Sequence, residues 1–195
     1  HQAGIVHRDL KPSNIMVDVH RHARVMDFGL AAPVQGASDP QQISGTPAYM
    51  APEAAEGAAP TPAMDVYSAA LVLIELLTGK PLIHQTDPWQ ALYRVAHEDL
   101  ALPDDLGPGV DDGLRAILQR GMARRPSERY ASAAEFRDAL RAWAAPASAP
   151  TAASNATLDF LLRRMRHKSD FPALSDSVAR IQRVANSEDD SISDL

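Results

Sequence analysis

The chain has 195 residues, of which 45% are hydrophobic and 23% are charged, and this balance excludes a wholly disordered or collagen-like protein. Its 19 Lys and Arg residues against 25 Asp and Glu residues give a formal net charge of -6, which argues against a nucleic-acid binder that relies on broad attraction to phosphates. The sequence contains no cysteine, so disulfides, thiolate nucleophiles and cysteine-ligated metal sites are excluded.

Short apolar runs of the strand type dominate the first region of the chain. Residues 15–17 and 24–26 are strand candidates, and the polar residues 18–22 between them suit the exposed turn of a hairpin. Residues 31–46 hold Pro, Gly, Ser, Asp and Gln without a period, which predicts a long loop. Long loops in compact domains are usually functional or disordered.

From Asp65 onward the pattern becomes helical. Residues 66–77 are apolar almost all round, which predicts a buried helix capped by Asp65 and ended by Gly79 and Pro81. This run is too short to span a bilayer, and it contains Glu75, so we expect no membrane segment. Further helices are expected from Asp87-Pro88 to about 96, around 114–122, and from Ser132, which forms a capping box with Glu135. The second half of the chain is therefore predicted to be a helical subdomain.

Residues 144–157 consist mainly of Ala, Pro, Ser and Thr and predict a linker, because they cannot bury enough apolar surface to become ordered. Beyond this linker, apolar residues recur at helical spacing at Leu158, Leu161, Leu162 and Met165, and again from Leu174 to Val184. The basic cluster within 163–168 is expected to be the solvated face of the first of these helices.

Three short motifs follow one another along the chain. His7 to Asn14 reads H-R-D-L-x-x-x-N, Asp27-Phe28-Gly29 follows the predicted hairpin, and Ala51-Pro52-Glu53 follows the long loop. In this order and placement they resemble the C-terminal lobe of a eukaryotic-like serine/threonine protein kinase of the kind that bacteria carry, over about residues 1–143.

The resemblance implies an α+β fold: a mainly α-helical kinase C-terminal lobe with short β-hairpins over 1–143, then the linker 144–157 and a helical segment 158–195. The last segment resembles the beginning of an HDOD domain, a helical signalling module of bacteria. The alternative is a generic amphipathic helical pair that packs on the lobe or on a partner. A kinase also needs a glycine-rich loop, a strand lysine and a helix glutamate before the catalytic loop. Since the sequence begins at His1, we expect a fragment that is inactive alone.

The resemblance also implies a role for each motif residue. Asp9 would accept or orient the proton of the substrate hydroxyl, and Lys11 would place a cation on the transferring phosphate. Asn14 and Asp27 would hold Mg²⁺, and together with Lys11 they would bind ATP. The other site residues would be structural or regulatory. His7, Phe28 and Gly29 would pack beneath the site, and Thr46 would lie beside Asp9 and Lys11. Arg8 would be the partner of a phosphorylated loop residue such as Ser38 or Ser44. Asp65 would accept hydrogen bonds from the backbone of the catalytic loop, residues 7–14, and Glu53 would form an ion pair with Arg129.

Two hypotheses for the function follow from these residues. The first is an ATP- and Mg²⁺-dependent kinase that phosphorylates Ser and Thr hydroxyls of proteins, and the second is a pseudokinase or scaffold that acts as a binding module in bacterial signalling. The intact set of Asp9, Lys11, Asn14 and Asp27 favours the kinase, because a scaffold has no physical need for a base, a cation and metal ligands together. We expect protein substrates, signalling partners of the C-terminal segment, no nucleic acid, and a cytoplasmic location.

Overall fold

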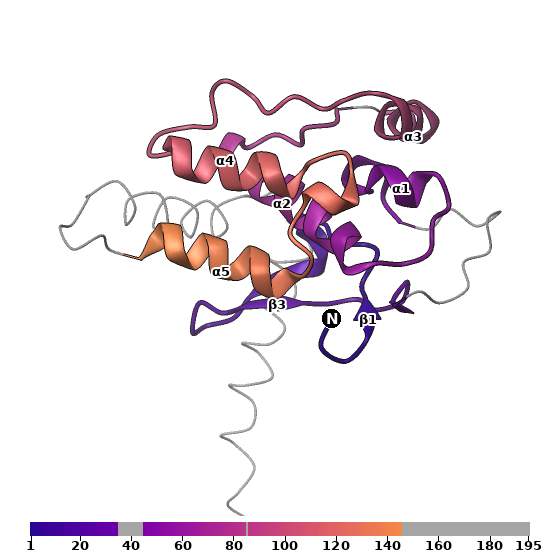
Figure 1. Ribbon diagram of the computed structural model, residues 1–195, viewed down its shortest axis with the longest axis horizontal. Coiled ribbons are helices and arrows are strands. Elements are labelled where there is room, and N and C mark those ends of the chain that lie inside the picture. Colours follow the sequence, from indigo (N-terminus) through magenta and orange to yellow (C-terminus); the bar gives the residue numbers. More distant parts are fainter. Residues whose placement is uncertain (35–44, 85, 146–195) are drawn as a thin grey trace, which may run out of the picture.

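A computed structural model describes residues 1–34, 45–84 and 86–145 (Figure 1). Most of the predicted linker and the whole segment 158–195 lie outside the described residues. The strands are β1 (Ile5–Val6), β2 (Ile15–Val17), β3 (Ala23–Val25) and β4 (Ala32–Pro33); the α-helices are α1 (Pro52–Ala55), α2 (Pro62–Thr78), α3 (Pro88–His97), α4 (Asp112–Gly121) and α5 (Ala133–Ala144); and single turns of 3-10 helix are η1 (Pro12–Asn14), η2 (Pro47–Tyr49) and η3 (Pro126–Glu128).

The strands form small antiparallel sheets, and β2 and β3 make the predicted hairpin, with Ile15 opposite Val25 and Val17 opposite Ala23. The second strand begins one residue earlier than predicted. The reason is the Asp18 carboxylate, which accepts hydrogen bonds from the backbone N–H groups of His20 and His22 and so closes the turn at His22. The other sheet pairs β1 with β4.

Helix α2 is the centre of the core and is buried almost all round, as its apolar sequence predicts. It begins at Pro62, so the prediction that Asp65 caps it is wrong: Thr61 occupies the N-cap position, and Asp65 lies within the first turn. Proline is favoured at the first helical position because the N–H that it lacks has no partner there. The helix ends at Gly79, whose φ of 79° is the left-handed conformation that glycine adopts at helix ends.

The predicted starts of α3 and α5 are confirmed by their capping bonds, and a similar bond at Asp111, which was not predicted, begins α4. Asp87 accepts from Trp89 N–H at the start of α3, Asp111 from Leu114 N–H at α4, and Ser132 Oγ from Glu135 N–H at α5. The Glu135 carboxylate reaches Ala131 N–H, one residue before the position expected for a capping box. Helix α5 continues to Ala144, the first residue of the predicted linker.

Two groups of packed side chains position the rest of the molecule around α2. Helices α4 and α5 pack on α2 through Leu114, Leu118 and Phe136. A second cluster joins Met50, Ala55, Ile83 and residues of α3, which lies beside α1 in Figure 1. The described part is therefore helix-rich with small antiparallel sheets, an α+β arrangement, and none of its helices has both the length and the apolar character needed to cross a membrane.

Candidate active site

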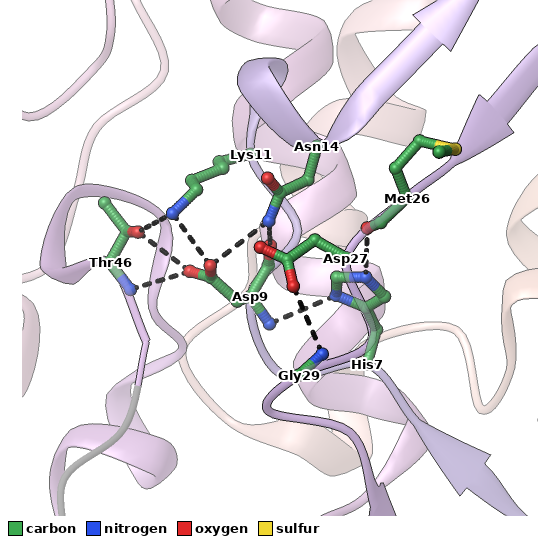
Figure 2. Close-up of polar contacts among 8 residues, drawn as sticks. All are labelled: His7, Asp9, Lys11, Asn14, Met26, Asp27, Gly29 and Thr46. Atoms are coloured by element: carbon green, nitrogen blue, oxygen red, sulfur yellow. Dashed lines mark hydrogen bonds and ion pairs between the residues drawn. The ribbon is translucent and has the colours of Figure 1, made fainter.

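Asp9 lies at the centre of a polar cluster that includes Lys11, Asn14 and Thr46 (Figure 2). The Oδ1 atom of Asp9 accepts hydrogen bonds from the backbone N–H of Thr46 at 3.0 Å and from its hydroxyl at 2.8 Å. The Oδ2 atom lies 2.8 Å from the Lys11 ammonium and accepts from the Asn14 amide at 3.2 Å. The same amide donates to the Asp9 carbonyl at 2.9 Å, so both the loop and its carboxylate are held in place.

The electrostatics of this cluster keep Asp9 ionised. Burial opposes the charged form, because Asp9 is only 8% exposed, but the hydrogen bonds from Lys11 and Thr46 and the charge of Lys11 outweigh it and lower the pKa of the Asp9 carboxyl below its usual value. An ionised carboxylate is an acceptor only, so at neutral pH Asp9 can accept a hydrogen bond from a hydroxyl group placed beside it.

Lys11 and Thr46 join two segments of the chain. The Lys11 ammonium donates to Thr46 Oγ1 at 2.9 Å, and it keeps its contact with Asp9 at the same time. The Lys11 side chain is 27% exposed, so its positive charge lies near the surface of the site, where an anionic group can reach it.

Asp65 holds residues 7–14, which the resemblance identifies as a catalytic loop, from the first turn of α2. Its Oδ2 accepts from the backbone N–H of His7 at 2.8 Å, and its Oδ1 accepts from that of Arg8 at 2.9 Å. Burial raises the pKa of Asp65, and the two backbone donors oppose that rise. Arg8 has a φ of 71°, a left-handed conformation that is uncommon outside glycine, so the bonds to Asp65 stabilise a strained backbone next to Asp9.

His7 connects the catalytic loop to the Asp27-Phe28-Gly29 motif. Its Nδ1 accepts from Asp9 N–H at 3.3 Å, which makes Nε2 the donor to the Met26 carbonyl at 2.9 Å. The His7 ring also packs edge-on against Phe28, with 4.8 Å between the ring centroids. Asp27 follows with a φ of 60°, and its Oδ1 accepts from Gly29 N–H at 3.2 Å. A side chain at Gly29 would crowd that carboxylate, since a Cβ there would lie 3.1 Å from it.

Asn14 and Asp27 have the oxygen chemistry that suits Mg²⁺. Met26 N–H donates to the Asn14 carbonyl at 2.8 Å, which brings the residue before Asp27 onto the Asn14 backbone. Within the described ranges, no group of three or more His, Cys, Asp or Glu side chains is arranged to hold a metal ion. A magnesium ion held by Asn14 and Asp27 would also bind phosphate oxygens, as Mg²⁺ in nucleotide sites generally does.

Glu53 and Arg129 form a two-pronged ion pair away from Asp9. The two guanidinium nitrogens Nη1 and Nη2 each lie 2.7 Å from a Glu53 carboxylate oxygen. The remaining donors reach the backbone carbonyls of Ala63, Ala123 and Arg124, and the guanidinium lies 4.7 Å above the Tyr67 ring. This pair ties α1 to α2 and to the segment before η3. The loop residues 38 and 44, expected as phosphorylated partners of Arg8, lie outside the described residues.

Sequence reasoning did not find three contacts beside the site. The Tyr49 hydroxyl donates to Glu75 at 2.5 Å, and the Tyr49 carbonyl accepts from Ser68 Oγ at 2.7 Å, so α2 holds the segment that follows Thr46. Burial and the neighbouring Glu75 carboxylate raise the pKa of Tyr49. The sequence signal for this contact was Glu75, a carboxylate within the apolar run 66–77, which indicates a buried polar partner. His1 also contacts Asp65, at 2.9 Å, and nothing in the sequence pattern indicates it.

Comparisons with known proteins place this sequence among protein kinases. The family model described as protein kinase domain matches residues 1–138. The serine/threonine-protein kinase PknB of Mycobacterium leprae is 36% identical over 167 residues, which cover 83% of this chain and 27% of the relative. PknB of Mycobacterium tuberculosis is 37% identical over 141 residues, which cover 70% of this chain and 22% of the relative. The chain thus spans about a quarter of the length of these relatives.

Proposed function

Because the chain belongs to the protein kinase family, we propose that the whole protein transfers the γ-phosphate of ATP to serine and threonine hydroxyls of other proteins. The observation that carries this proposal is the ionised Asp9 carboxylate, which Thr46, Lys11 and Asn14 hold in one orientation. Phosphoryl transfer depends mainly on positioning and on neutralising charge, and this cluster supplies an acceptor and a cation side by side.

In the proposed reaction, Asp9 orients the substrate hydroxyl by accepting its hydrogen bond and then takes its proton. Thr46 holds Oδ1 through two hydrogen bonds, so the carboxylate cannot rotate away. The Lys11 ammonium, 2.8 Å from Oδ2, lies where it can pair with an oxygen of the transferring phosphate. Lys11 and Thr46 are also the residues that serine/threonine kinases carry in these motifs.

Asn14 and Asp27 would hold Mg²⁺, and with Lys11 they would bind the phosphates of ATP. Bound MgATP would supply the phosphoryl group and the positive charge that offsets its oxygens. The chain's own contribution is to orient the ligands: Asn14 is fixed by its two bonds to Asp9, and Asp27 by the N–H of Gly29.

We also propose the domain organisation that the family implies. Residues 1–143 would form the C-terminal lobe, 144–157 a linker, and 158–195 a helical segment for signalling partners. The helix-rich fold with small sheets supports the first of these assignments. A kinase that draws on cellular ATP acts in the cytoplasm, which supports that location for the described residues.

The proposal is tested in the full-length protein with Asp9→Asn, which keeps the size of the side chain and removes its charge. We expect turnover to fall by about 10² to 10⁴-fold, the usual contribution of a positioned base. Asp27→Ala should abolish Mg²⁺-dependent nucleotide binding, measured by calorimetry. The exposed Asp138→Asn is the matched control and should leave both quantities unchanged. Unchanged turnover in Asp9→Asn, with the fold intact by circular dichroism, would contradict the role of Asp9.

A further inference from the structure

A cavity of about 580 Å³ lies between the C-terminal end of α2 and the segment that leads into α4. Ile74 and Leu77 of α2 contribute apolar lining, together with Leu82 and the prolines Pro81, Pro103 and Pro108. Asp65, which holds the catalytic loop, lies twelve residues before Leu77 on the same helix, about 18 Å away at 1.5 Å per residue. The cavity is therefore separate from the candidate active site.

The charges along the cavity border favour an occupant of a particular kind. Asp105 lines the cavity and the exposed Asp104 adjoins it, while the Arg115 guanidinium donates to the backbone carbonyls of Pro103 and Asp104. Lys80 and His84 also line the cavity. An apolar segment with a mainly basic flank and an acidic residue near one end would complement both kinds of border charge.

The chain beyond α5 begins next to this cavity. Trp143 Nε1 donates to Asp111 Oδ1 at 2.8 Å, so the end of α5 lies at the start of α4, and both ends lie on the same side of Figure 1. Pro108 precedes Asp111 by three residues, so their Cα atoms are at most about 11 Å apart. The predicted linker residues 146–157 could span up to about 40 Å when extended. A tether of this length gives effective concentrations of about millimolar, so weak docking is sufficient.

We propose that residues 158–168 of this chain dock in the cavity. The spacing of Leu158, Leu161, Leu162 and Met165 predicts one apolar helical face, which would contact the partly exposed lining residues Leu82, Pro81, Pro103 and Pro108. The flanking basic residues, among them Arg163 and Arg166, would face Asp104 and Asp105, and Asp159 would face Lys80. This docking does not depend on the proposed kinase reaction.

A thiol pair tests the proposal, because these 195 residues contain no cysteine. In the complete chain, Leu162→Cys is combined with Pro108→Cys on the cavity wall, and in the matched control with Glu128→Cys, which lies beyond the other end of α4. We expect the intrachain disulfide with Pro108→Cys to form with a yield about tenfold above the control, since local concentration sets the rate. Equal yields, or a crosslink only between two copies, would overturn the proposal.

Amide hydrogen exchange gives an independent readout. Leu161→Asp should raise exchange in residues 74–84 and 103–108 by about tenfold, because a carboxylate in an apolar cavity is strongly unfavourable. Ala156→Asp, in the predicted linker, is the control and should leave exchange unchanged. Asp104→Lys should lower the disulfide yield, whereas Glu128→Lys should not. If residues 158–168 instead belong to a separate helical domain, exchange around the cavity will not respond to Leu161→Asp, and the proposal fails.

Discussion

Asp65 acts on the catalytic loop through two separate oxygen atoms. Each oxygen accepts from a different backbone N–H, those of His7 and Arg8, and the residue is only 4% exposed. Its role is thus defined by residues far along the chain rather than by its own helix. A side chain of the same size with one oxygen cannot reproduce this pair of bonds.

Asp65→Asn should detach the catalytic loop. The new amide group would point an N–H at a backbone N–H, which leaves a buried donor without an acceptor and costs about 1 to 3 kcal/mol in the free energy of unfolding. Chemical denaturation measures this loss, and amide exchange at His7 and Arg8 locates it. Asp112→Asn, an exposed aspartate of α4, should change neither. Wild-type exchange at His7 in Asp65→Asn would contradict the assignment.

Tyr67 should make the stability of the fold fall at alkaline pH. Burial raises its pKa from 10.0 to about 12, although the charge of Arg129 opposes the shift. Because the folded chain keeps this proton when the unfolded chain has lost it, the unfolded state binds fewer protons, and stability falls as pH rises from about 10 to 12, by about 2 to 3 kcal/mol in total.

Denaturant unfolding at several pH values between about 10 and 12 measures how steeply the free energy of unfolding falls with pH. Tyr67→Phe should make the fall of stability with pH shallower, while the partly buried Tyr49 continues to contribute. Tyr93→Phe alters a ring that is 64% exposed and serves as the matched control. A slope that is identical in Tyr67→Phe and the wild type would show that burial does not set the titration of this residue.

At the scale of elements, a single buried arginine joins three parts of the chain. The Arg129 side chain is 0% exposed, and it binds Glu53 of α1, the Ala63 carbonyl of α2 and carbonyls before η3. The neighbouring Arg124 donates to the Val95, Ala96 and Glu98 carbonyls at the end of α3. Together the two arginines fix α1 and α3 beside η2, the segment that follows Thr46.

Glu53→Gln should destabilise the fold strongly, because it leaves the Arg129 guanidinium buried without its counter-charge. We expect a loss of about 3 to 5 kcal/mol in the free energy of unfolding. Glu128→Gln is the matched control, since it breaks an ion pair with Arg125 in which both side chains are more than half exposed, and it should cost less than about 1 kcal/mol. Similar losses for the two variants would show that burial is not what matters here.

The sequence predicted those elements whose signals are local. Asp87 and Ser132 each bond to a residue two or three positions ahead, and these local signals predicted the starts of α3 and α5. Asp111 bonds in the same way at the start of α4, but the prediction for that helix rested on its apolar spacing alone. The predicted start of α2 is wrong because Asp65 was interpreted as the helix cap, whereas its carboxylate bonds to residues 57 and 58 positions away, a contact that only the family resemblance implied. The local signal for the true start of α2, a Thr at the N-cap followed by a Pro at the first helical position, is present at Thr61-Pro62.

The same distinction holds for the candidate site. Asp9, Lys11 and Asn14 lie within one loop and were identified from a single motif, and their contact with Thr46 followed from family resemblance. The bond between Tyr49 and Glu75 was missed, because a carboxylate in an apolar run indicates only that some buried partner exists. Which partner it is depends on how η2 packs on α2.

At the scale of the whole molecule, the approach of the helices around Gly121 limits what the core can accept. A Cβ at this position would lie 2.9 Å from the Ala70 Cβ of α2 and 3.3 Å from the Phe136 ring of α5. These distances are shorter than normal van der Waals contacts. The three helices therefore pack on one another at a point where only glycine fits.

Gly121→Ala should separate these helices and destabilise the fold by about 1 to 3 kcal/mol through overpacking, which exceeds the gain of about 1 kcal/mol in helix propensity. Thermal unfolding measures the net effect. Gln119→Ala, an exposed position on α4, should stay within about 0.5 kcal/mol of the wild type. Combining Gly121→Ala with Ala70→Gly restores the space, so the double variant should lose less than the sum of the single losses; additive losses would refute a steric cause.

The bonds that build the candidate site differ from those that build the helices in how far they reach along the chain. Lys11 meets Thr46 across 35 residues and His7 meets Asp65 across 58, whereas helical bonds close over four. Long chain closures slow the formation of such contacts, so we expect the helices to form first and the catalytic loop to dock last and open first. Circular dichroism would then report full helix content even in molecules whose site is not assembled. Protection of the His7 amide from hydrogen exchange would measure the fraction of molecules with an assembled site.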